Sequence, residues 1–442
     1  MTQSRKALRL FLGRSLFPGV RILLMRSCGR RHPSSLSSSE GWVFIVMKEK
    51  KQHVFILGSK GIPASYGGFE TFADELVKMQ KSENIFYHVA CLKEPAPSQN
   101  YDHVDRVWVK TPPVGPATAV LYDLLALRQC LRWCRNHPEA EKPVFYILAC
   151  RIGPFMAYFA RQIHRLGGSL FINPDGHEWK RAKWNKIIRR YWKMSEKLMV
   201  KQADLIICDN QAIQKYIQNE YPGLDPKTMF IPYGAYLDKV GHTEKRKQAY
   251  EQWLNEHQLE RFGYYLIVGR FVPENNYETI IREHMASNTK RKLAIICTEN
   301  EKLFRELDEK LQFSKDDRIL FIGTEYNQDL LMEIREGAYA YYHGHEVGGT
   351  NPSLLEALAK TDVNLVLDVA FNKEVAGDAG IYWTKENGNL RAVIEHTEKL
   401  TEEERASYSQ KAKKRIKDCY SWPSIVQQYE QIFEERGRKT GT

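Results

Sequence analysis

Several loops of this chain carry residues that could bind and transform an anionic substrate. Residues 348–352 read Gly-Gly-Thr-Asn-Pro, which cannot lie inside a helix or a central strand, because paired glycines and a proline break both hydrogen-bond ladders. Residues 353–359 then have high helix propensity, with Ser353 or Asn351 placed to cap the helix. A short apolar strand is expected just before, at 337–342. This order of strand, glycine turn and helix start directs backbone N–H groups and the positive end of a helix dipole at one spot, which suits a diphosphate.

Glu356 lies one turn into this helix, where its carboxylate would accept hydrogen bonds from ribose hydroxyls. A tight turn that binds no ligand is the simpler interpretation of one Gly-Gly loop taken alone. The other loops reverse that preference, because they place similar groups at the ends of other expected strands.

A second loop, at residues 173–181, follows an expected strand and reads Asn-Pro-Asp-Gly-His-Glu-Trp-Lys-Arg. Ligands of open α/β sheets bind at the carboxyl ends of strands, so these side chains should project into a crevice. The catalytic candidates are Asp175, His177 and Glu178, and the candidates for acceptor or phosphate binding are Lys180 and Arg181. A carboxylate here would act as a general base and the cations as phosphate contacts. The alternative is that Asp175 caps the next helix and the basic residues are solvated.

Two more loops also follow the carboxyl end of an expected strand. An apolar strand at 53–58 opens onto a loop in which Gly67 and Gly68 stand at the entrance of a helix, offering bare backbone N–H groups. No G-x-G-x-x-G motif is present, so the pattern gives little support to a dinucleotide site. Later in the chain, Arg270 follows another strand where it could meet a phosphate, and Glu274 lies where it could reach a sugar hydroxyl. The alternative is that Arg270 and Glu274 are ordinary charged loop residues that bind no ligand.

Strands and helices are expected to alternate along the whole chain. The expected strands are 53–58, 86–92, 106–110, 144–149, 169–173, 205–209, 264–269, 292–297, 319–322, 338–342 and 364–368, with helices near 72–80, 117–136, 153–166, 180–202 and 422–433. This alternation predicts an α/β protein with two doubly wound parallel sheets, for which 442 residues suffice. The expected domains are 47–234 and 235–420, and residues 421–442 form a helix that returns to the first domain.

The composition is that of a soluble globular protein, with 43% hydrophobic and 27% charged residues. The net charge of +11 indicates an anionic partner such as a nucleic acid, an anionic lipid or a phosphorylated substrate. Eight cysteines show no metal or disulfide spacing, which predicts reduced thiols and a cytosolic location. No uncharged run after residue 47 has the length of a transmembrane helix.

Residues 1–46 differ from the rest, with eight Arg or Lys, Glu40 as the one acid, and a serine-rich run at 34–39. A transit peptide has this composition. So does upstream sequence translated by mistake, because Met47 leads directly into the first strand. We favour the second interpretation and expect this segment to be disordered and outside the fold.

The expected helix at 180–202 holds nine Lys or Arg with aromatic residues interleaved. Its apolar stripe is expected to consist of Trp184, Ile187, Ile188, Tyr191 and Leu198. Cations and tryptophans outside such a stripe are typical of a helix that rests on anionic lipid headgroups. They would also suit RNA, but no nucleic-acid motif is present.

Four motifs together resemble a known family. Residues 66–71 (YGGFET), 269–274 (GRFVPE), 349–357 (GTNPSLLEA) and the closing Ser421-Trp422 helix are similar to two-domain GT-B glycosyltransferases of family four. Within that family they most resemble bacterial, streptococcal-type rhamnosyltransferases of cell-wall polysaccharide and capsule synthesis. The resemblance extends from about residue 53 to residue 433. It implies two Rossmann-like domains that face a central crevice.

The resemblance also implies a reaction. It is retaining, metal-independent transfer of rhamnose from dTDP-β-L-rhamnose to glucose or N-acetylglucosamine on a polyprenyl diphosphate, of the β-1,4 type, with no cofactor. The enzyme would work at the cytoplasmic face of the cell membrane as a peripheral protein. The alternatives are a transferase that uses another nucleotide sugar, such as a UDP-hexose, and a basic lipid- or nucleic-acid-binding protein without turnover.

By the same resemblance, Arg270 holds the donor diphosphate and Glu356 binds ribose. The further donor-binding residues are Gly67, Gly68, Glu274, Gly348, Gly349, Thr350 and Asn351. The sequence departs from the family pattern at two places. The first of two glutamates eight residues apart is replaced by Gly348, with Glu346 two residues too early, and Asn275 and Asn276 stand near the place of a usual lysine.

Overall fold

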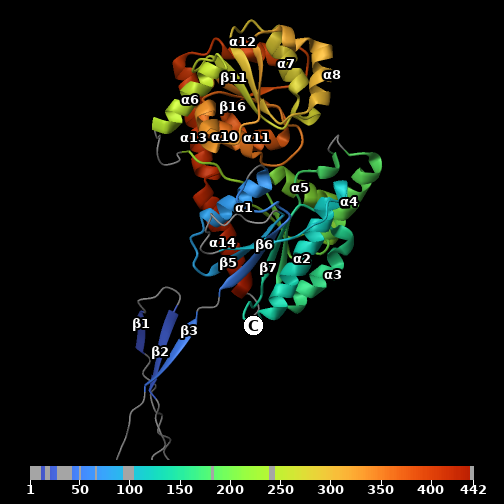
Figure 1. Cartoon of the computed structure of the whole chain (residues 1–442), viewed down its shortest axis with the longest axis vertical. Helices are drawn as coiled ribbons and strands as arrows, with labels where there is room; N and C mark the ends of the chain where they lie inside the picture. Colours follow the sequence, from blue (N-terminus) through green and yellow to red (C-terminus); the bar gives the residue numbers. More distant parts are fainter. Residues whose placement is uncertain are drawn as a thin grey trace, which may run out of the picture.

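The computed structural model describes residues 11–14, 20–26, 42–48, 51–64, 67–92, 104–180, 184–237 and 244–438. Two α/β domains lie one above the other, with the chain's second half in the upper domain of Figure 1. Each domain is built on a parallel sheet, as the alternation of strands and helices predicts. No helix within the described ranges combines the length and the apolar character needed to cross a bilayer.

The first domain holds a seven-stranded sheet in the order β10-β9-β8-β7-β4-β5-β6. Its strands are β4 (Gln52–Leu57), β5 (Ile85–Cys91), β6 (Val104–Trp108), β7 (Val144–Leu148), β8 (Ser169–Asn173), β9 (Leu205–Cys208) and β10 (Thr228–Phe230). Its helices are α1 (Gly68–Lys78), α2 (Thr118–Asn136), α3 (Gly153–Arg165), α4 (Lys186–Val200) and α5 (Gln211–Glu220). The central strands are buried on both faces, which is why they are continuous apolar runs rather than alternating ones.

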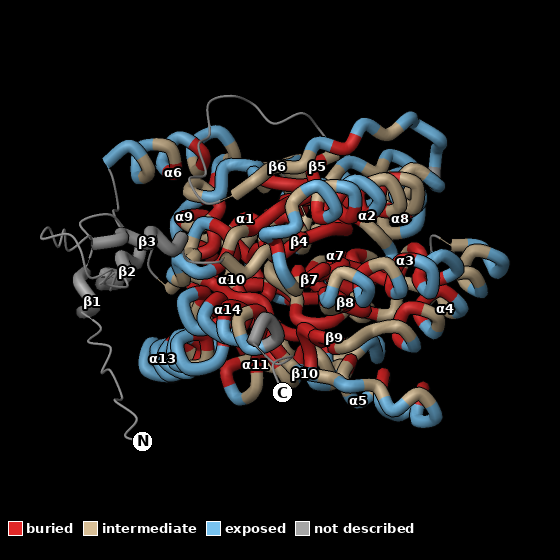
Figure 2. The backbone as a smooth tube through the Cα atoms, turned by 90° about the horizontal axis from the view of Figure 1, so that it is seen from below, coloured by how far each residue is buried: buried red, intermediate tan, exposed pale blue. Residues whose placement is uncertain are grey.

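The second domain holds a six-stranded parallel sheet in the order β13-β12-β11-β14-β15-β16. Its strands are β11 (Tyr264–Gly269), β12 (Lys292–Cys297), β13 (Ile319–Gly323), β14 (Ala340–His343), β15 (Asn364–Leu367) and β16 (Gly380–Trp383). Its helices are α6 (Glu244–Glu256), α7 (Tyr277–Ala286), α8 (Glu301–Leu311), α9 (Gln328–Glu336), α10 (Pro352–Lys360), α11 (Ala370–Ala376), α12 (Asn389–Thr397) and α13 (Glu402–Cys419). Buried strands occupy the middle of both domains, and exposed helix faces form the rim (Figure 2).

The last helix, α14 (Trp422–Arg438), leaves the second domain and lies against the first sheet (Figure 1). Its Tyr429 hydroxyl lies 3.2 Å from that of Tyr146 on β7, and its Glu430 accepts a 2.7 Å hydrogen bond from the Lys81 N–H. Two segments of the chain connect the domains, and they lie side by side. The Ala235 N–H on the first donates a 2.7 Å hydrogen bond to the Tyr420 carbonyl on the second.

Three strands near the start of the chain form an antiparallel sheet of their own. They are β1 (Phe11–Arg14), β2 (Val20–Arg26) and β3 (Trp42–Lys48). The expectation that residues 1–46 lack regular structure is therefore not met at these strands, and the rest of that segment lies outside the described residues. Met47 pairs with Arg21 inside this sheet, so it does not mark the edge of a folded unit.

Helix α4 begins at Lys186, six residues later than expected, because Asn185 caps it and accepts a 3.0 Å bond from the Ile188 N–H. Its expected apolar stripe fails at Ile187, which is 82% exposed, whereas Ile188, Tyr191 and Leu198 are partly buried. The fully buried residues of the helix are Ser195, Glu196, Met199 and Val200, and Ser195 accepts from the Gly153 N–H and donates to the Cys150 carbonyl. The buried face therefore continues the expected stripe and adds a polar contact to the start of α3.

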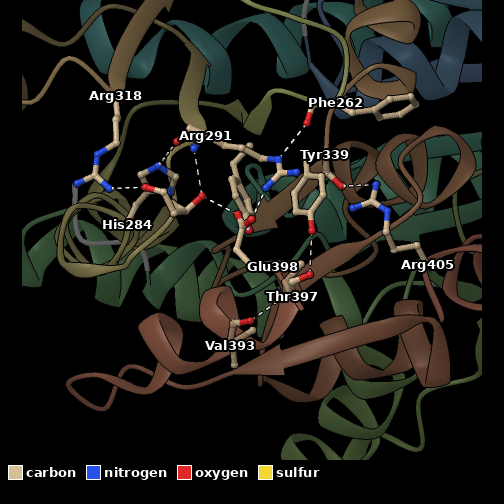
Figure 3. A network of polar contacts seen from close by, with 11 residues as sticks. Phe262, His284, Arg291, Arg318, Tyr339, Val393, Thr397, Glu398 and Arg405 are labelled. Atoms are coloured by element: carbon tan, nitrogen blue, oxygen red, sulfur yellow. Dashed lines mark hydrogen bonds and ion pairs between the residues drawn. The ribbon is translucent and has the colours of Figure 1, made fainter. Parts of the chain in front are cut away.

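A polar network stabilises the far side of the second domain, away from the crevice (Figure 3). Glu398 accepts hydrogen bonds from the Tyr265 and Thr289 hydroxyls, at 2.9 and 2.5 Å, and pairs with Arg291. The guanidinium groups of Arg291 and Arg405 lie over the ring of Tyr339, 3.5 and 4.0 Å from its centroid. The Glu398 carboxylate, just after α12, therefore links that helix to β11 and to the loop before β12.

Replacing Glu398 with alanine should lower the free energy of unfolding by about 2–3 kcal/mol, because buried hydroxyls lose their acceptor. Denaturant titration measures this, and Glu398→Gln, which keeps one acceptor oxygen, should lose less. Nucleotide binding should not change in either folded variant. Equal stability of wild type and Glu398→Ala would contradict this role.

Candidate functional site

A cavity of about 820 Å³ lies between the two domains. The first domain contributes the loop before α1, the segment after β7, the loop after β8 and the end of β9, and the second contributes the loops after β11, β13 and β14. Lining residues include Gly67, Gly68, Arg151, Asp175, Glu178 and Asp209 from the first domain, and Arg270, His345, Gly348, Gly349, Thr350, Asn351 and Glu356 from the second. Both sheets thus present the carboxyl ends of strands to one space, as α/β ligand sites do.

Two of the loops predicted to bind substrate, at residues 173–181 and 348–352, touch each other across the crevice. A Cβ atom on Gly176 would lie 2.4 Å from the carbonyl carbon of Gly348 and 2.7 Å from the nitrogen of Gly349. Backbone therefore packs directly on backbone between the domains. Gly348 has φ +147°, a conformation that side-chain-bearing residues rarely adopt, which explains glycine rather than glutamate at this position.

Asp209, just past β9, extends this contact. The Thr350 hydroxyl donates a hydrogen bond to the Asp209 carbonyl, and the Asp209 carboxyl faces Gly349. A Cβ atom on Gly349 would lie 2.3 Å from Oδ1 of Asp209, so only glycine leaves room for that carboxyl. Burial and the nearby Asp175 raise the pKa of Asp209 to about 8.

Helix α10 begins at the cavity. Asn351 is its cap and accepts a 2.9 Å bond from the Ser353 N–H, so asparagine rather than serine has the capping role. Ser353 instead donates a 2.9 Å bond to the Val268 carbonyl at the end of β11. Pro352 lies 3.7 Å from the Cβ position of Gly68 at the start of α1. The first turns of α1 and α10 therefore meet at the cavity, and both place positive dipole ends there.

Arg270 is exposed and lines the cavity from the loop after β11. Its carbonyl accepts a 2.8 Å bond from the Asn275 side chain, which fixes the loop. Within the described residues, no carboxylate pairs with its guanidinium at salt-bridge distance. Asn275 and Asn276 are buried and bond to backbone carbonyls, so they build the loop and do not stand in for a lysine at the cavity.

Glu356 lines the cavity and also pairs with Arg335, whose Nη2 lies 2.5 Å from its Oε2. Arg335 is only 2% exposed, so this ion pair fixes the direction of the carboxylate. The side chain of Glu356 remains about one third exposed, at 32%. One side of the Glu356 carboxylate is thus available to a ligand, while Arg335 on the other side fixes its conformation.

Asp175 and Glu178 both line the first-domain side of the cavity. Asp175 has φ +59° and its N–H donates a 2.8 Å bond to the Asn173 side chain, so it forms a tight turn and does not cap a helix. Glu178 accepts a 2.9 Å bond from the Trp184 indole. Between them and the sheet, Arg151 donates to the Gly58 carbonyl at 2.8 Å and to Asp123 at 3.1 Å.

Three predicted site residues do not line the cavity. His177 packs on Tyr216, with ring centroids 4.2 Å apart, and burial lowers its pKa to about 4, with the nearby Lys180 adding to the effect. Lys180 points to solvent over the ring of Trp179. Glu274 is buried, and its carbonyl accepts from the Glu346 N–H. Arg181 lies outside the described residues.

Glu346 also faces away from the cavity, since its carboxylate accepts bonds from Asn276 at 3.1 Å and Lys385 at 2.6 Å. It therefore does not replace the missing glutamate. Arg151 and Asp209 are cavity residues that the sequence prediction missed. Each comes directly after an apolar strand, and the rule that parallel strands end at the crevice would have found both.

Solved structures with the same architecture are glycosyltransferases of the GT-B type, which confirms the predicted fold. Sucrose-phosphate synthase of Thermosynechococcus elongatus matches with a TM-score of 0.69 and 14% identity, over 87% of this chain and 99% of that one. A glycosyltransferase of Rickettsia africae matches with a TM-score of 0.67 and 11% identity, over 88% and 100%. HepE of Anabaena in complex with UDP-glucose matches with a TM-score of 0.63 and 12% identity, over 87% and 99%.

Sequence comparisons agree with the fold. An uncharacterised glycosyltransferase of Methanocaldococcus jannaschii is 25% identical over 281 residues, which are 62% of this chain and 67% of the relative. Residues 51–236 match the model of a domain of unknown function, DUF1972. With the crevice between the two domains, these similarities show that the chain has the GT-B fold, and they support a glycosyltransferase enzyme.

Proposed function

We propose that this enzyme transfers a sugar from a nucleoside diphosphate to a hydroxyl of a lipid-linked acceptor sugar. The observation that carries the proposal is the start of α10, where Gly349 and its neighbours face a cavity shared with Arg270. Backbone N–H groups at a helix start and one guanidinium neutralise a diphosphate. HepE, which shares the fold, was solved with UDP-glucose.

The proposed transfer requires that the negative charge of the leaving diphosphate be neutralised, which N–H groups and a guanidinium can do without a metal. The bond between the sugar carbon and the phosphate oxygen breaks, and the negative charge that develops on the leaving diphosphate is stabilised by the oriented N–H groups and Arg270. The acceptor hydroxyl forms the new bond on the same face of the sugar, and its proton passes to the Asp175 carboxylate. Glu356 binds the ribose.

The specific donor proposed is dTDP-β-L-rhamnose, and the acceptor is glucose or N-acetylglucosamine on a polyprenyl diphosphate. The motifs at residues 58–64 (GSKGIPA) and 175–181 (DGHEWKR) support this choice, since this pair resembles rhamnosyltransferases in particular. Incubation with dTDP-rhamnose and a synthetic lipid-diphosphate sugar should yield the acceptor mass plus one deoxyhexose. Transfer from a UDP-hexose alone in a donor panel would overturn the donor, and no transfer from any nucleotide sugar would overturn the proposal.

Replacing Asp175 with asparagine should lower transfer at least tenfold, about 1.4 kcal/mol of barrier, because a neutral amide cannot accept the hydroxyl proton. The amide has almost the same shape, and asparagine tolerates the φ of +59° at this turn. Single-turnover rates measure the change, and nucleotide affinity serves as the control for folding. Full activity of the variant would exclude Asp175 from the reaction.

The proposal also places the enzyme on an anionic membrane surface, which a lipid acceptor requires. Helices α2, α3 and α4 lie side by side on the first domain (Figure 1). Their exposed basic residues are Arg128, Arg132, Arg135, Arg161, Arg165, Lys186, Arg190, Lys197 and Lys201. The acids of these three helices, Asp123 and Glu196, are both buried, so the exposed Asp, Glu, Lys and Arg side chains that the helices contribute are all basic.

Apolar side chains accompany these cations. Phe155, Tyr158 and Ile187 are 48%, 61% and 82% exposed. All three lie in the first turns of α3 and α4, at the sheet edge that borders the crevice. Such residues enter the headgroup region while basic residues attract anionic lipids. An acceptor sugar anchored in the same membrane would then be delivered beside the cavity.

Reversing three of these charges, with Arg161→Glu, Arg165→Glu and Arg190→Glu together, should weaken binding to phosphatidylglycerol vesicles at least a hundredfold, since each cation contributes about 1 kcal/mol. Vesicle cosedimentation measures this. A matched control reverses Lys302, Arg305 and Lys310 on α8 and should bind vesicles as wild type does. Loss of RNA binding without any loss of vesicle binding would contradict the membrane assignment.

A further inference from the structure

Asp209 is a carboxyl group of the cavity that the proposed reaction does not yet use. It is 5% exposed and lies where β9 ends, under the loop that begins α10 in the other domain. Its Oδ1 is the atom nearest to the Cβ position of Gly349, at 2.3 Å. Within the described residues, Oδ1 has no hydrogen-bond partner. A buried oxygen without a partner costs about 1–3 kcal/mol unless a ligand satisfies it.

The two acids that face this carboxyl, Asp175 from the loop after β8 and Glu374 from α11, favour its protonated form. Tyr233, after β10, donates a hydrogen bond to it, which opposes that effect, and Cys208 precedes it on β9. From the second-domain loop, Gly349 lies against the carboxyl, and the Thr350 hydroxyl donates to the Asp209 backbone carbonyl. With burial as the largest cause and Asp175 next, the pKa is about 8, so the carboxyl carries its proton at neutral pH.

We propose that Asp209 is a phosphate-binding residue of the donor site, whose carboxyl O–H donates a hydrogen bond from Oδ1 to a phosphate oxygen of the nucleoside diphosphate. The site is formed by both domains, because the amides come from the loop of the second domain and the carboxyl from the first. This inference rests on the proposed function, since it adds a contact to the diphosphate placed at Gly349.

The protonation state decides the sign of the interaction. A protonated carboxyl is a donor to phosphate, whereas a carboxylate at the same place repels it. Nucleotide affinity should therefore be full below the pKa of Asp209 and should fall as the pH rises through about 8. A guanidinium group is protonated throughout this pH range. Ionisation of Asp209 and not loss of the guanidinium would then cause the decrease.

The test is calorimetric binding of UDP and dTDP to the full-length protein between about pH 7 and about pH 9.5, a range that spans the titration. Wild-type affinity should fall at least tenfold across it. Asp209→Asn keeps a donor that cannot ionise, so its affinity should stay nearly constant. Asp209→Ala should bind at least tenfold more weakly than Asp209→Asn at neutral pH. The same pH dependence in wild type and Asp209→Asn would overturn the inference.

Two controls separate the possible causes. Asp225→Asn changes an exposed carboxyl of the same domain and should behave as wild type. Uridine and thymidine lack phosphate, so any binding they show should not depend on Asp209. If UDP and dTDP fail to bind any variant, the proposed function fails with the inference. If they bind equally well with aspartate, asparagine or alanine at position 209, only the role of Asp209 is lost.

Discussion

Transfer should fall at least a hundredfold, about 2.7 kcal/mol of barrier, when Gly176 is replaced by alanine. The added methyl group would lie 2.4 Å from the Gly348 carbonyl carbon and 2.5 Å from its Cα, and no rotamer can relieve a contact between backbones. The loops must move apart, which separates Asp175 from the diphosphate site. Displacement of about 1 Å is enough to cost two orders of magnitude in a positioned reaction.

Each domain should fold normally in this variant, because Gly176 lies in the loop between β8 and α4 and the close contacts of its Cβ position are with the other domain. The matched control is Gly223→Ala in the same domain, where a Cβ atom meets nothing within 4 Å. Rates of sugar transfer, with circular dichroism and thermal melting for folding, measure the difference. If Gly176→Ala keeps the activity of Gly223→Ala, the contact between the two loops has no part in the reaction.

Donor binding should weaken by about ten- to a hundredfold when Arg270 is replaced by alanine, since a hydrogen bond to a charged group contributes about 1.5–3 kcal/mol. The expected loss is large because Arg270 is exposed at the cavity and no described carboxylate neutralises it. Titration with dTDP and UDP measures affinity, and the transfer rate at saturating donor reports stabilisation of the leaving group.

Two variants define the origin of this loss. Arg270→Lys keeps the charge without the planar fork, so it should fall between wild type and Arg270→Ala. Arg305→Ala removes an arginine from α8 that is 70% exposed and should leave affinity unchanged. Undiminished binding by Arg270→Ala would place the diphosphate elsewhere in the crevice.

The fold could be predicted because its signals are local. Buried parallel strands such as β7 and β11 are continuous apolar runs with a turn after them, and helices between them are amphipathic. The missed strands of the two domain sheets are short and weak: β10 has three residues and β16 has four. The start of α4 was missed because Asn185 caps it, after residues that have equally good helix propensity.

The site was predicted only where a residue's own loop decides its position. Gly349, Asn351 and Arg270 follow strand ends, and all three line the cavity. His177 and Glu274 follow strand ends as well, but His177 packs on Tyr216 and Glu274 is buried, and the spacing of the motif does not predict such packing. The contact of Asp209 with Gly349 joins residues 140 positions apart in different domains, so no local pattern could reveal it.

The double crossing between the domains has a consequence for truncation. Because the Ala235 N–H donates a hydrogen bond to the Tyr420 carbonyl, the second domain is an insertion into the first, and its two ends lie side by side. Helix α14 then completes the core of the first domain, with Tyr429 and Phe433 fully buried there. Removing α14 from the end of the chain would therefore destabilise the first domain and leave the second domain intact.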